Sequence, residues 1–163
     1  MGRSARKIIS LKDLDKVLEK IHKKKEKIIV SGGCFDIFHY GHLFFLKKAR
    51  KEGDFLIILL ESDEFIKKNK QRKPIHSLNQ RAEILAELES VDLVVKLPLL
   101  VKDEDYLRII KTIKPSVIAI TAGDEKLKKK ANIAKKINAQ LKIVTNLLSD
   151  FSSSSIRKKL KLL

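Results

Sequence analysis

The sequence has one cysteine and no tryptophan, and each scarcity excludes a class of structure. A single thiol, Cys34, cannot form a disulfide within the chain, which fits a reducing compartment. With no tryptophan, and with no aromatic residues interleaved among the basic ones, a base-stacking surface for single-stranded nucleic acid is not indicated. The longest apolar stretches, such as residues 55–60, are far too short to cross a bilayer. We therefore expect a globular protein without stable membrane insertion.

The sequence also lacks a targeting signal and any internal division. Its start, "MGRSARKIIS", has Arg6 where a myristoylation signal has Ser or Thr, and no apolar signal core follows. No Gly/Ser tract, repeat or low-complexity segment separates one part from another. A length of 163 residues suits one domain with a continuous core. We expect a single domain over residues 1–163 and a cytoplasmic location.

Positive charge is in large excess: 36 Lys and Arg against 20 Asp and Glu give a formal charge of +16. Such an excess attracts anions, whether nucleotides, nucleic acid or acidic lipid headgroups. The basic residues are scattered, mostly at helical spacing, in runs such as 23–25, 67–68, 128–130 and 135–136. A nucleic-acid-binding module, the alternative from a different class, would gather this charge on one face. We interpret the lysines as solvated helix faces and expect no nucleic-acid partner.

Short apolar runs alternate with longer amphipathic segments along the whole chain. The runs typical of strands are 27–31, 55–60, 92–96, 116–121 and 141–145. The helical segments are 11–24, 42–52, 62–69, 78–89, 103–112, 125–138 and a last helix starting near Ser154. Alternation of this kind predicts an α/β three-layer sandwich with a five-stranded parallel sheet and right-handed crossovers. In such sheets ligands bind beyond the carboxyl ends of the strands.

The stretch "GCFDIFHYGH", residues 33–42, leaves the first confident strand at that edge. Gly33 allows close backbone approach, and Gly41 removes a side chain from a helix start. A helix start attracts phosphate through its unpaired N–H groups and the positive end of its dipole. His39 and His42 lie beside it, and a pKa near neutrality would let them carry partial positive charge. Zinc is a weaker alternative, because the only cysteine lies upstream and no carboxylate has the HExxH-type spacing. The pattern predicts a phosphate site.

The same stretch resembles the HxGH signature of the nucleotidyltransferase superfamily, specifically its cytidylyltransferase-like branch. The resemblance runs from about Ile28 to Lys159, through "GDFLIILLESDEF", "KQRKPIHSLNQRAEIL", "VDLVV" and "SSSSIRKKL". It implies a Rossmann-like, HUP-type nucleotide-binding fold. It also implies transfer of a nucleoside monophosphate from a nucleoside triphosphate to a small phosphorylated acceptor, with release of pyrophosphate. Mg²⁺ would arrive with the ATP or CTP, so no metal ligands are expected from the protein.

The resemblance also implies which residues act. Attack on the α-phosphorus is direct, so the site has to position the reactants and neutralise charge on the leaving pyrophosphate. The residues given catalytic roles are His39, His42, Lys70 and Arg72. Those given nucleotide or phosphate binding are Gly33, Cys34, Phe35, Gly41, Arg81, Asp124, Ser153, Ser154 and Arg157. The loop with Lys70 and Arg72 would close over acceptor and triphosphate, the serine segment would hold the β- and γ-phosphates, and Asp36 would fix its loop.

The motifs resemble three types of enzyme within this branch, which differ in the nucleotide and the acceptor that they use. The leading helix, "GGCFD" and "AGD" are similar to heptose-phosphate adenylyltransferases, whereas "KQRKPIHS" is similar to glycerol-3-phosphate cytidylyltransferases. Archaeal-type FAD synthetases share most of these motifs. The resemblance favours ATP over CTP and leaves the acceptor open among a sugar phosphate, glycerol phosphate and FMN. Because such relatives often pair through their loop regions, we expect a homodimer.

Overall fold

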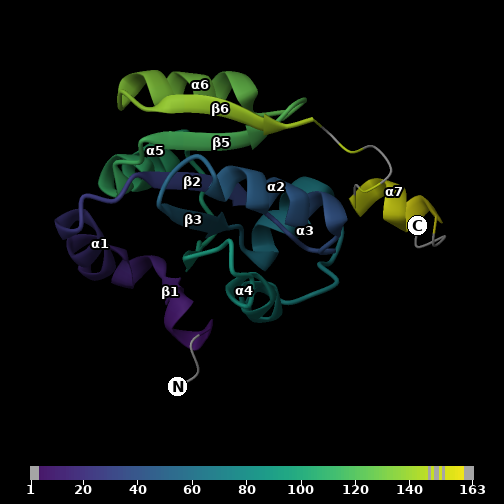
Figure 1. Cartoon of the computed structure of the whole chain (residues 1–163). Coiled ribbons are helices and arrows are strands. Elements are labelled where there is room, and N and C mark those ends of the chain that lie inside the picture. Colours follow the sequence, from purple (N-terminus) through teal and green to yellow (C-terminus); the bar gives the residue numbers. More distant parts are fainter. Residues whose placement is uncertain (1–3, 147, 149–150, 152, 160–163) are drawn as a thin grey trace.

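The computed structural model describes residues 4–146, 148, 151 and 153–159, which form an α/β fold with one parallel sheet (Figure 1). The strands are β1 Ile8–Ser10, β2 Ile28–Gly33, β3 Phe55–Leu60, β4 Leu93–Lys96, β5 Val117–Thr121 and β6 Gln140–Thr145. The α-helices are α1 Leu14–Lys23, α2 Tyr40–Arg50, α3 Asp63–Lys70, α4 Leu78–Ala86, α5 Asp103–Ile113, α6 Leu127–Lys136 and α7 Ser153–Lys159. Short 3₁₀ helices span Ser4–Lys7 and Leu11–Asp13. In the part of the chain described, no helix combines the length and the hydropathy needed to cross a membrane.

The sheet has six strands in the order β1-β4-β3-β2-β5-β6, so the prediction of five strands was wrong. The strand that the sequence did not reveal is β1, which pairs in parallel with β4 so that Ile8 faces Val94. It is only three residues long and only partly buried. A segment this short shows no alternation of apolar and polar residues, and its place in the sheet depends on β4.

Two hydrophobic clusters form the core, and neighbouring strand residues contribute to different ones. Ile28 and Val30 of β2 belong to the cluster that includes α1, α5 and α6, whereas Ile29 belongs to the cluster with α2 and α4. Successive side chains of a strand point to opposite faces of its sheet. The two clusters therefore lie on opposite faces, each covered by helices.

The order of the strands changes direction between β2 and β5. From β2 the chain proceeds to β3 and β4 on one side of the sheet, while β5 pairs with β2 on the other side and continues to β6. The helices that follow these two strands, α2 and α6, pack on opposite faces. Such a change opens a crevice at the carboxyl ends of the two strands, where ligands of α/β proteins bind. Figure 1 shows α7 beyond the arrowheads of β5 and β6, at this same edge.

Candidate functional site

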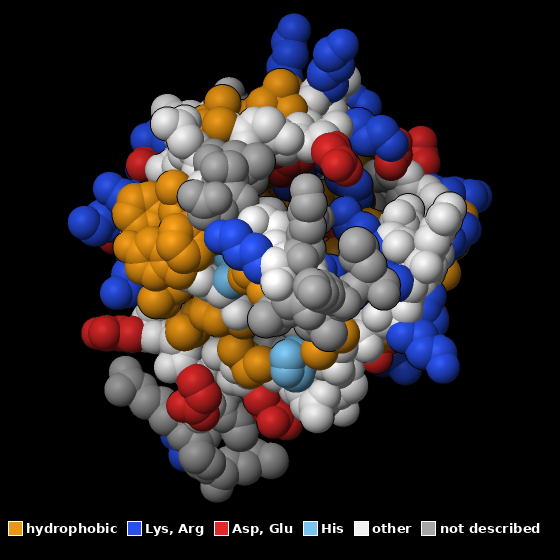
Figure 2. Space-filling model, turned by 90° about the vertical axis from the view of Figure 1, so that its right-hand side faces the viewer, with side chains coloured by type: hydrophobic (Ala, Val, Ile, Leu, Met, Phe, Trp, Pro, Cys, Tyr) orange, Lys and Arg blue, Asp and Glu red, His pale blue; other side chains and the backbone are white. Residues whose placement is uncertain are grey.

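A cavity of about 280 Å³ lies at the carboxyl ends of β2, β5 and β6, in the crevice between β2 and β5. The predicted site residues that line it are Gly33, Cys34, Phe35, His39, Gly41, His42, Asp124 and Ser153. Figure 2 views the molecule from this edge and shows hydrophobic side chains gathered beside histidine. The exposed aromatic side chains of Tyr40 and Phe151 contact each other here, with ring centres 5.4 Å apart. The structure thus brings both histidines and a serine of the last helix to one cavity.

The two histidines stack at the start of α2. Their ring centres are 3.7 Å apart, and Nδ1 of His39 accepts a hydrogen bond from the backbone N–H of His42 at 3.3 Å. His39 therefore caps α2, which begins at Tyr40 rather than at 42 as the sequence predicted. Because Nδ1 is the acceptor, the proton of a neutral His39 ring lies on Nε2, which can donate to a ligand. The Phe35 ring, 5.0 Å from that of His42, helps to fix the pair.

Both rings have a pKa below the ordinary value for histidine. Burial lowers the pKa of His39. Burial, followed by the charge of His39, lowers the pKa of His42 to about 3, although the Ile37 carbonyl opposes the shift. The prediction of partial positive charge on the two histidines was therefore wrong, because aromatic neighbours remove the water that would stabilise an imidazolium. Both histidines are neutral N–H donors near neutral pH.

This protonation state predicts the pH dependence of turnover. The pH profile of kcat/KM reports ionisations of the free enzyme. We expect no break that belongs to His42 between about pH 5 and pH 8, because its pKa in the free protein is about 3. Initial rates of wild type and His42→Asn across this range test the point. A break near pH 6.5 that is present in wild type and missing from the variant would contradict it.

Gly41 allows the start of α2 to approach the chain that precedes α7. A Cβ atom at this position would lie 2.8 Å from the Phe151 carbonyl oxygen and 3.0 Å from Nδ1 of His39. Real Cβ atoms essentially never come as close to another atom as the first of these distances. The glycine between the two histidines therefore lets the stacked pair and the segment before α7 share one wall of the cavity.

Asp36, in the loop between β2 and α2, is buried, with 3% of the residue exposed, and it holds several segments near the cavity together. Its Oδ1 accepts hydrogen bonds from the backbone N–H groups of Ile75 at 2.7 Å and His76 at 3.1 Å. Its Oδ2 accepts one from Nη1 of Arg72 and lies 3.6 Å from Nη2 of Arg157. The carboxylate thus connects the loop after β2 to the segment before α4 and to α7, which agrees with the structural role expected for it.

The Asp36 carboxyl should make stability depend on pH in the acid range. Burial raises its pKa, but the hydrogen bonds from Arg72, His76 and Ile75 outweigh burial and hold it below the ordinary value of 3.8. A group with a depressed pKa stabilises the fold above its unfolded pKa, and the contribution disappears as pH falls through the folded pKa. Asp36→Asn should cost about 1.5–3 kcal/mol near neutral pH. In urea unfolding, the gap between wild type and variant should shrink below about pH 4; a gap independent of pH would be the opposite result.

The predicted basic pair, Lys70 and Arg72, does not line the cavity. Lys70 is the exposed last residue of α3, a helix, where the sequence predicted a flexible loop. Arg72 follows the helix and is held by Asp36, with 25% of its side chain exposed. Arg157 also stays outside the lining, with 17% exposed and a buried Nε that has no hydrogen-bond partner among the described residues. Ser154 belongs to α7, but its side chain lies outside the described part.

Arg81, which the sequence predicted to bind nucleotide or phosphate, is instead a buried residue that holds parts of the chain together. It is fully buried, and its Nε donates to the His76 carbonyl at 3.1 Å. Its Nη1 donates to the carbonyls of Cys34 at 2.6 Å and Glu61 at 2.9 Å, and its Nη2 pairs with Asp63 at 2.6 Å. These bonds join the chain after β2, the chain after β3 and the start of α4. The guanidinium is occupied by structural partners and does not line the cavity, so the structure does not place Arg81 as a phosphate ligand.

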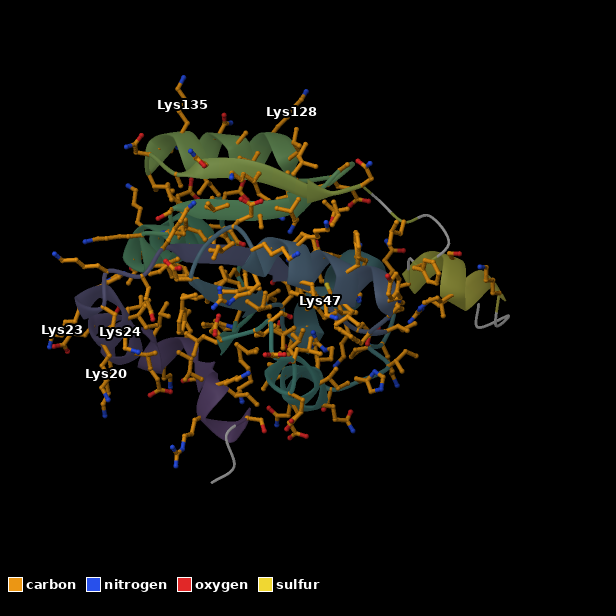
Figure 3. All side chains as sticks on the ribbon, in the orientation of Figure 1. Lys20, Lys23, Lys24, Lys47, Lys128 and Lys135 are labelled. Carbon is orange, nitrogen blue, oxygen red and sulfur yellow. The ribbon has the colours of Figure 1, made fainter. Side chains whose placement is uncertain are left out.

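Lys130 is a cavity residue that sequence reasoning missed, since it was grouped with the solvated lysines. Its ammonium pairs with Oδ2 of Asp124 at 2.7 Å, and 12% of its side chain is exposed. The signal was present in the helical spacing, because Leu127, Lys130 and Ala134 share one face of α6. By contrast, Figure 3 shows the side chains of Lys128 and Lys135 extending away from the molecule, as expected of a solvated face.

No metal site built by the protein is apparent in the described ranges: no three His, Cys, Asp or Glu side chains are placed to hold an ion together. Among the described residues, the carboxylate that lines the cavity is that of Asp124, which already accepts from the Lys126 backbone N–H at 2.8 Å and from Lys130. Its oxygens are therefore engaged by the protein.

Comparisons with known proteins identify relatives over most of this chain. A family profile described as "Cytidylyltransferase-like" matches residues 30–159. The bifunctional protein HldE of Helicobacter hepaticus is 44% identical over 119 residues, which cover 72% of this chain and 23% of that protein. The FAD synthase of Thermococcus sibiricus is 39% identical over 117 residues, which cover 66% of this chain and 76% of that protein. The chain thus spans about a quarter of the length of the HldE relatives it matches.

Solved structures agree on the architecture. A lipopolysaccharide core biosynthesis protein from Thermoplasma volcanium superposes with a TM-score of 0.59 at 26% identity, covering 75% of this chain and 96% of that one. A pantoate-beta-alanine ligase from Francisella tularensis gives a TM-score of 0.63 at 19% identity, covering 94% of this chain and 72% of that one. The second similarity supports a Rossmann-like fold alone.

Proposed function

This chain belongs to the cytidylyltransferase-like family, whose profile covers residues 30–159, and from that premise we propose that it is a nucleotidyltransferase. It transfers a nucleoside monophosphate from a nucleoside triphosphate to a small phosphorylated acceptor and releases pyrophosphate. ATP is the preferred nucleotide, and the acceptor is a sugar phosphate or FMN. A relative named FAD synthase supports an acceptor of the second kind. The similarity of "GGCFD" and "AGD" to heptose-phosphate adenylyltransferases supports the first.

The observation that carries the proposal is one shared cavity for His39, His42 and Ser153. His39 accepts from the N–H groups of His42 and Leu43, which leaves the N–H groups of Tyr40 and Gly41 without a partner in the described part of the chain. These two groups and the positive end of the helix dipole together can bind phosphate. The stacked histidines add neutral N–H donors at the same place. The acceptor oxygen attacks the α-phosphorus, the bond to the pyrophosphate oxygen breaks, and negative charge builds on the leaving group. Donors fixed before the reaction stabilise that charge without reorganisation.

The arginines around Asp36 are suited to the outer phosphates. Arg72 and Arg157 both contact this one carboxylate, so the group carries an excess of positive charge. The excess is available to the β- and γ-phosphates or to the acceptor phosphate. Lys70 and Ser154 keep the roles that the resemblance gives them. Phosphate oxygens and water would hold Mg²⁺, because Asp124, the carboxylate that lines the cavity in the described part of the chain, is engaged by Lys126 and Lys130.

A screen of pyrophosphate release tests the proposal. The purified chain is incubated with Mg²⁺ and either ATP or CTP, together with sugar 1-phosphates, glycerol 3-phosphate, FMN or phosphoethanolamine. We expect release that requires both a nucleotide and one class of acceptor. Release with CTP and glycerol 3-phosphate would favour the cytidylyltransferase alternative, which the segment "KQRKPIHS" suggests. No release with any pair, or release that needs no acceptor, would contradict nucleotidyl transfer.

A further inference from the structure

Lys130 lies on the buried side of α6, which is an unusual place for a lysine. Leu127 and Ala134, on the same face of the helix, pack against the core. The Lys130 side chain is 12% exposed and reaches the cavity. Burying an ammonium group is costly unless it is paired and hydrogen-bonded. The enclosed ammonium of Lys130 therefore needs hydrogen-bond partners. These partners determine which of its N–H donors are left for a ligand.

The partner that the structure provides is Asp124, in the turn between β5 and α6. Its Oδ2 accepts from Lys130 at 2.7 Å, while its Oδ1 accepts from the Lys126 backbone N–H at 2.8 Å. The carboxylate is thus fixed at both oxygens and orients the ammonium. An ammonium has three N–H donors. The contact with Asp124 is its one hydrogen bond to the described part of the chain, which leaves two donors for a ligand in the cavity.

The surroundings of Lys130 differ from those of the histidines. Thr121 at the end of β5, and Thr145 and Asn146 at the end of β6, line this part of the cavity. Burial raises the pKa of the Glu61 carboxyl, and the charges of Lys126 and Lys130 oppose that shift, so Glu61 lies within their range. The charges of Lys126 and Lys130 are matched here by those of Asp124 and Glu61, and Arg81, the third cation near Glu61, is paired with Asp63. Such a wall offers donors and acceptors without an excess of positive charge, and so it suits hydroxyl and carbonyl groups better than a polyphosphate.

We propose that Lys130, held in place by Asp124, binds the nucleoside half of the triphosphate by donating to an oxygen of the ribose or the base. The phosphates lie toward α2, on the β2 side of the crevice, and the nucleoside extends toward β5 and β6. This inference rests on the proposed function for the identity of the ligand. It assigns a binding role to one lysine of the run 128–130, which we interpreted from the sequence as a solvated helix face.

The chain provides a matched control in the next residue. Lys129 is on the same helix, 64% of its side chain is exposed, and it pairs with Asp103 at 2.9 Å. Replacing either lysine with methionine removes one positive charge and keeps most of the aliphatic stem. A difference between the two variants therefore reports the position of the charge and not the net charge of the protein.

Calorimetric titration with the non-hydrolysable α,β-methylene analogue of the preferred nucleotide is the first measurement. Lys130→Met should weaken binding about tenfold or more, the scale of one lost charge-assisted hydrogen bond. Lys129→Met should leave the affinity unchanged, and Lys130→Arg should retain it within about threefold. The affinity for pyrophosphate alone should stay the same in Lys130→Met. In turnover, KM for the nucleotide should rise about tenfold while kcat changes less than about threefold.

A double variant separates this role from a structural one. Lys130→Met leaves Asp124 without its partner, whereas Asp124→Asn/Lys130→Met removes the unpaired charge as well. If Lys130 only neutralised Asp124, the double variant would recover wild-type affinity, and the proposal would be overturned. Equal loss of pyrophosphate and nucleotide affinity in Lys130→Met would overturn it too. Failure of the wild type to bind any nucleotide would refute the proposed function itself, whereas wild-type affinity in Lys130→Met would refute this inference alone.

Discussion

Replacing His42 with alanine should lower kcat by about two to three powers of ten and leave the fold intact. This is the scale of losing one fixed donor to charge that develops in a transition state. His42 lines the cavity, stacks on His39 at 3.7 Å and is neutral near pH 7, so its contribution is a preorganised N–H. His39→Ala should have an effect of the same order. Pyrophosphate release under saturating substrates gives kcat, and circular dichroism checks the fold.

The matched control for the histidine variants is His22→Ala. His22 is an exposed residue near the end of α1, and its Nε2 contacts the Ile113 carbonyl oxygen at 3.0 Å, away from the cavity. Its removal should leave kcat unchanged. Wild-type turnover in the variant that lacks both His39 and His42 would show that the stacked pair does not stabilise the reaction.

Replacing Arg81 with methionine should lower the free energy of unfolding by about 3–5 kcal/mol, the cost of breaking a buried ion pair. The substitution leaves three backbone carbonyls and the Asp63 carboxylate without their donor. Since typical domains are stable by about 5–15 kcal/mol, much of the fold's stability would be lost. Urea unfolding followed by circular dichroism measures the change.

Arg108→Met serves as the control for this loss of stability, because Arg108 is exposed on α5. Its effect should stay within about 0.5 kcal/mol. An Arg81→Met protein with nearly unchanged stability and strongly reduced turnover would give the opposite answer. That outcome would return Arg81 to the phosphate-binding role that the sequence predicted.

The sequence was sufficient to predict the elements that carry their own pattern. The runs at β2, β3, β4 and β5 are apolar for several residues in succession, as strands covered on both faces are. The edge strand β6 was also predicted, although its residues are only partly buried or exposed. The HxGH stretch predicted a site at the carboxyl end of β2, and the structure shows a cavity there that also includes Asp124 and Ser153. By contrast, β1 carries too few residues to show a pattern, and only pairing with β4 makes it a strand.

What the sequence could not predict was the competition among side chains once the helices had packed. Arg81 follows a serine cap in a basic segment, which suggested a phosphate ligand. In the structure its guanidinium instead donates to the carbonyls of Cys34 and Glu61, which follow the ends of β2 and β3. Lys130 is adjacent in sequence to the solvated Lys129. Its spacing from Leu127 and Ala134 predicts the inner face of α6, but only the packing of this helix brings its ammonium to Asp124. The low pKa of His42 likewise depends on burial, which local sequence does not specify.

The most direct measurement is a crystal structure of the protein with Mg²⁺ and the α,β-methylene analogue of ATP. We expect the triphosphate at the start of α2, with ring nitrogens of His39 and His42 within hydrogen-bond distance of phosphate oxygens and Ser153 facing the same phosphates. An analogue bound elsewhere, or bound in the cavity with its phosphates away from both imidazoles, would contradict it.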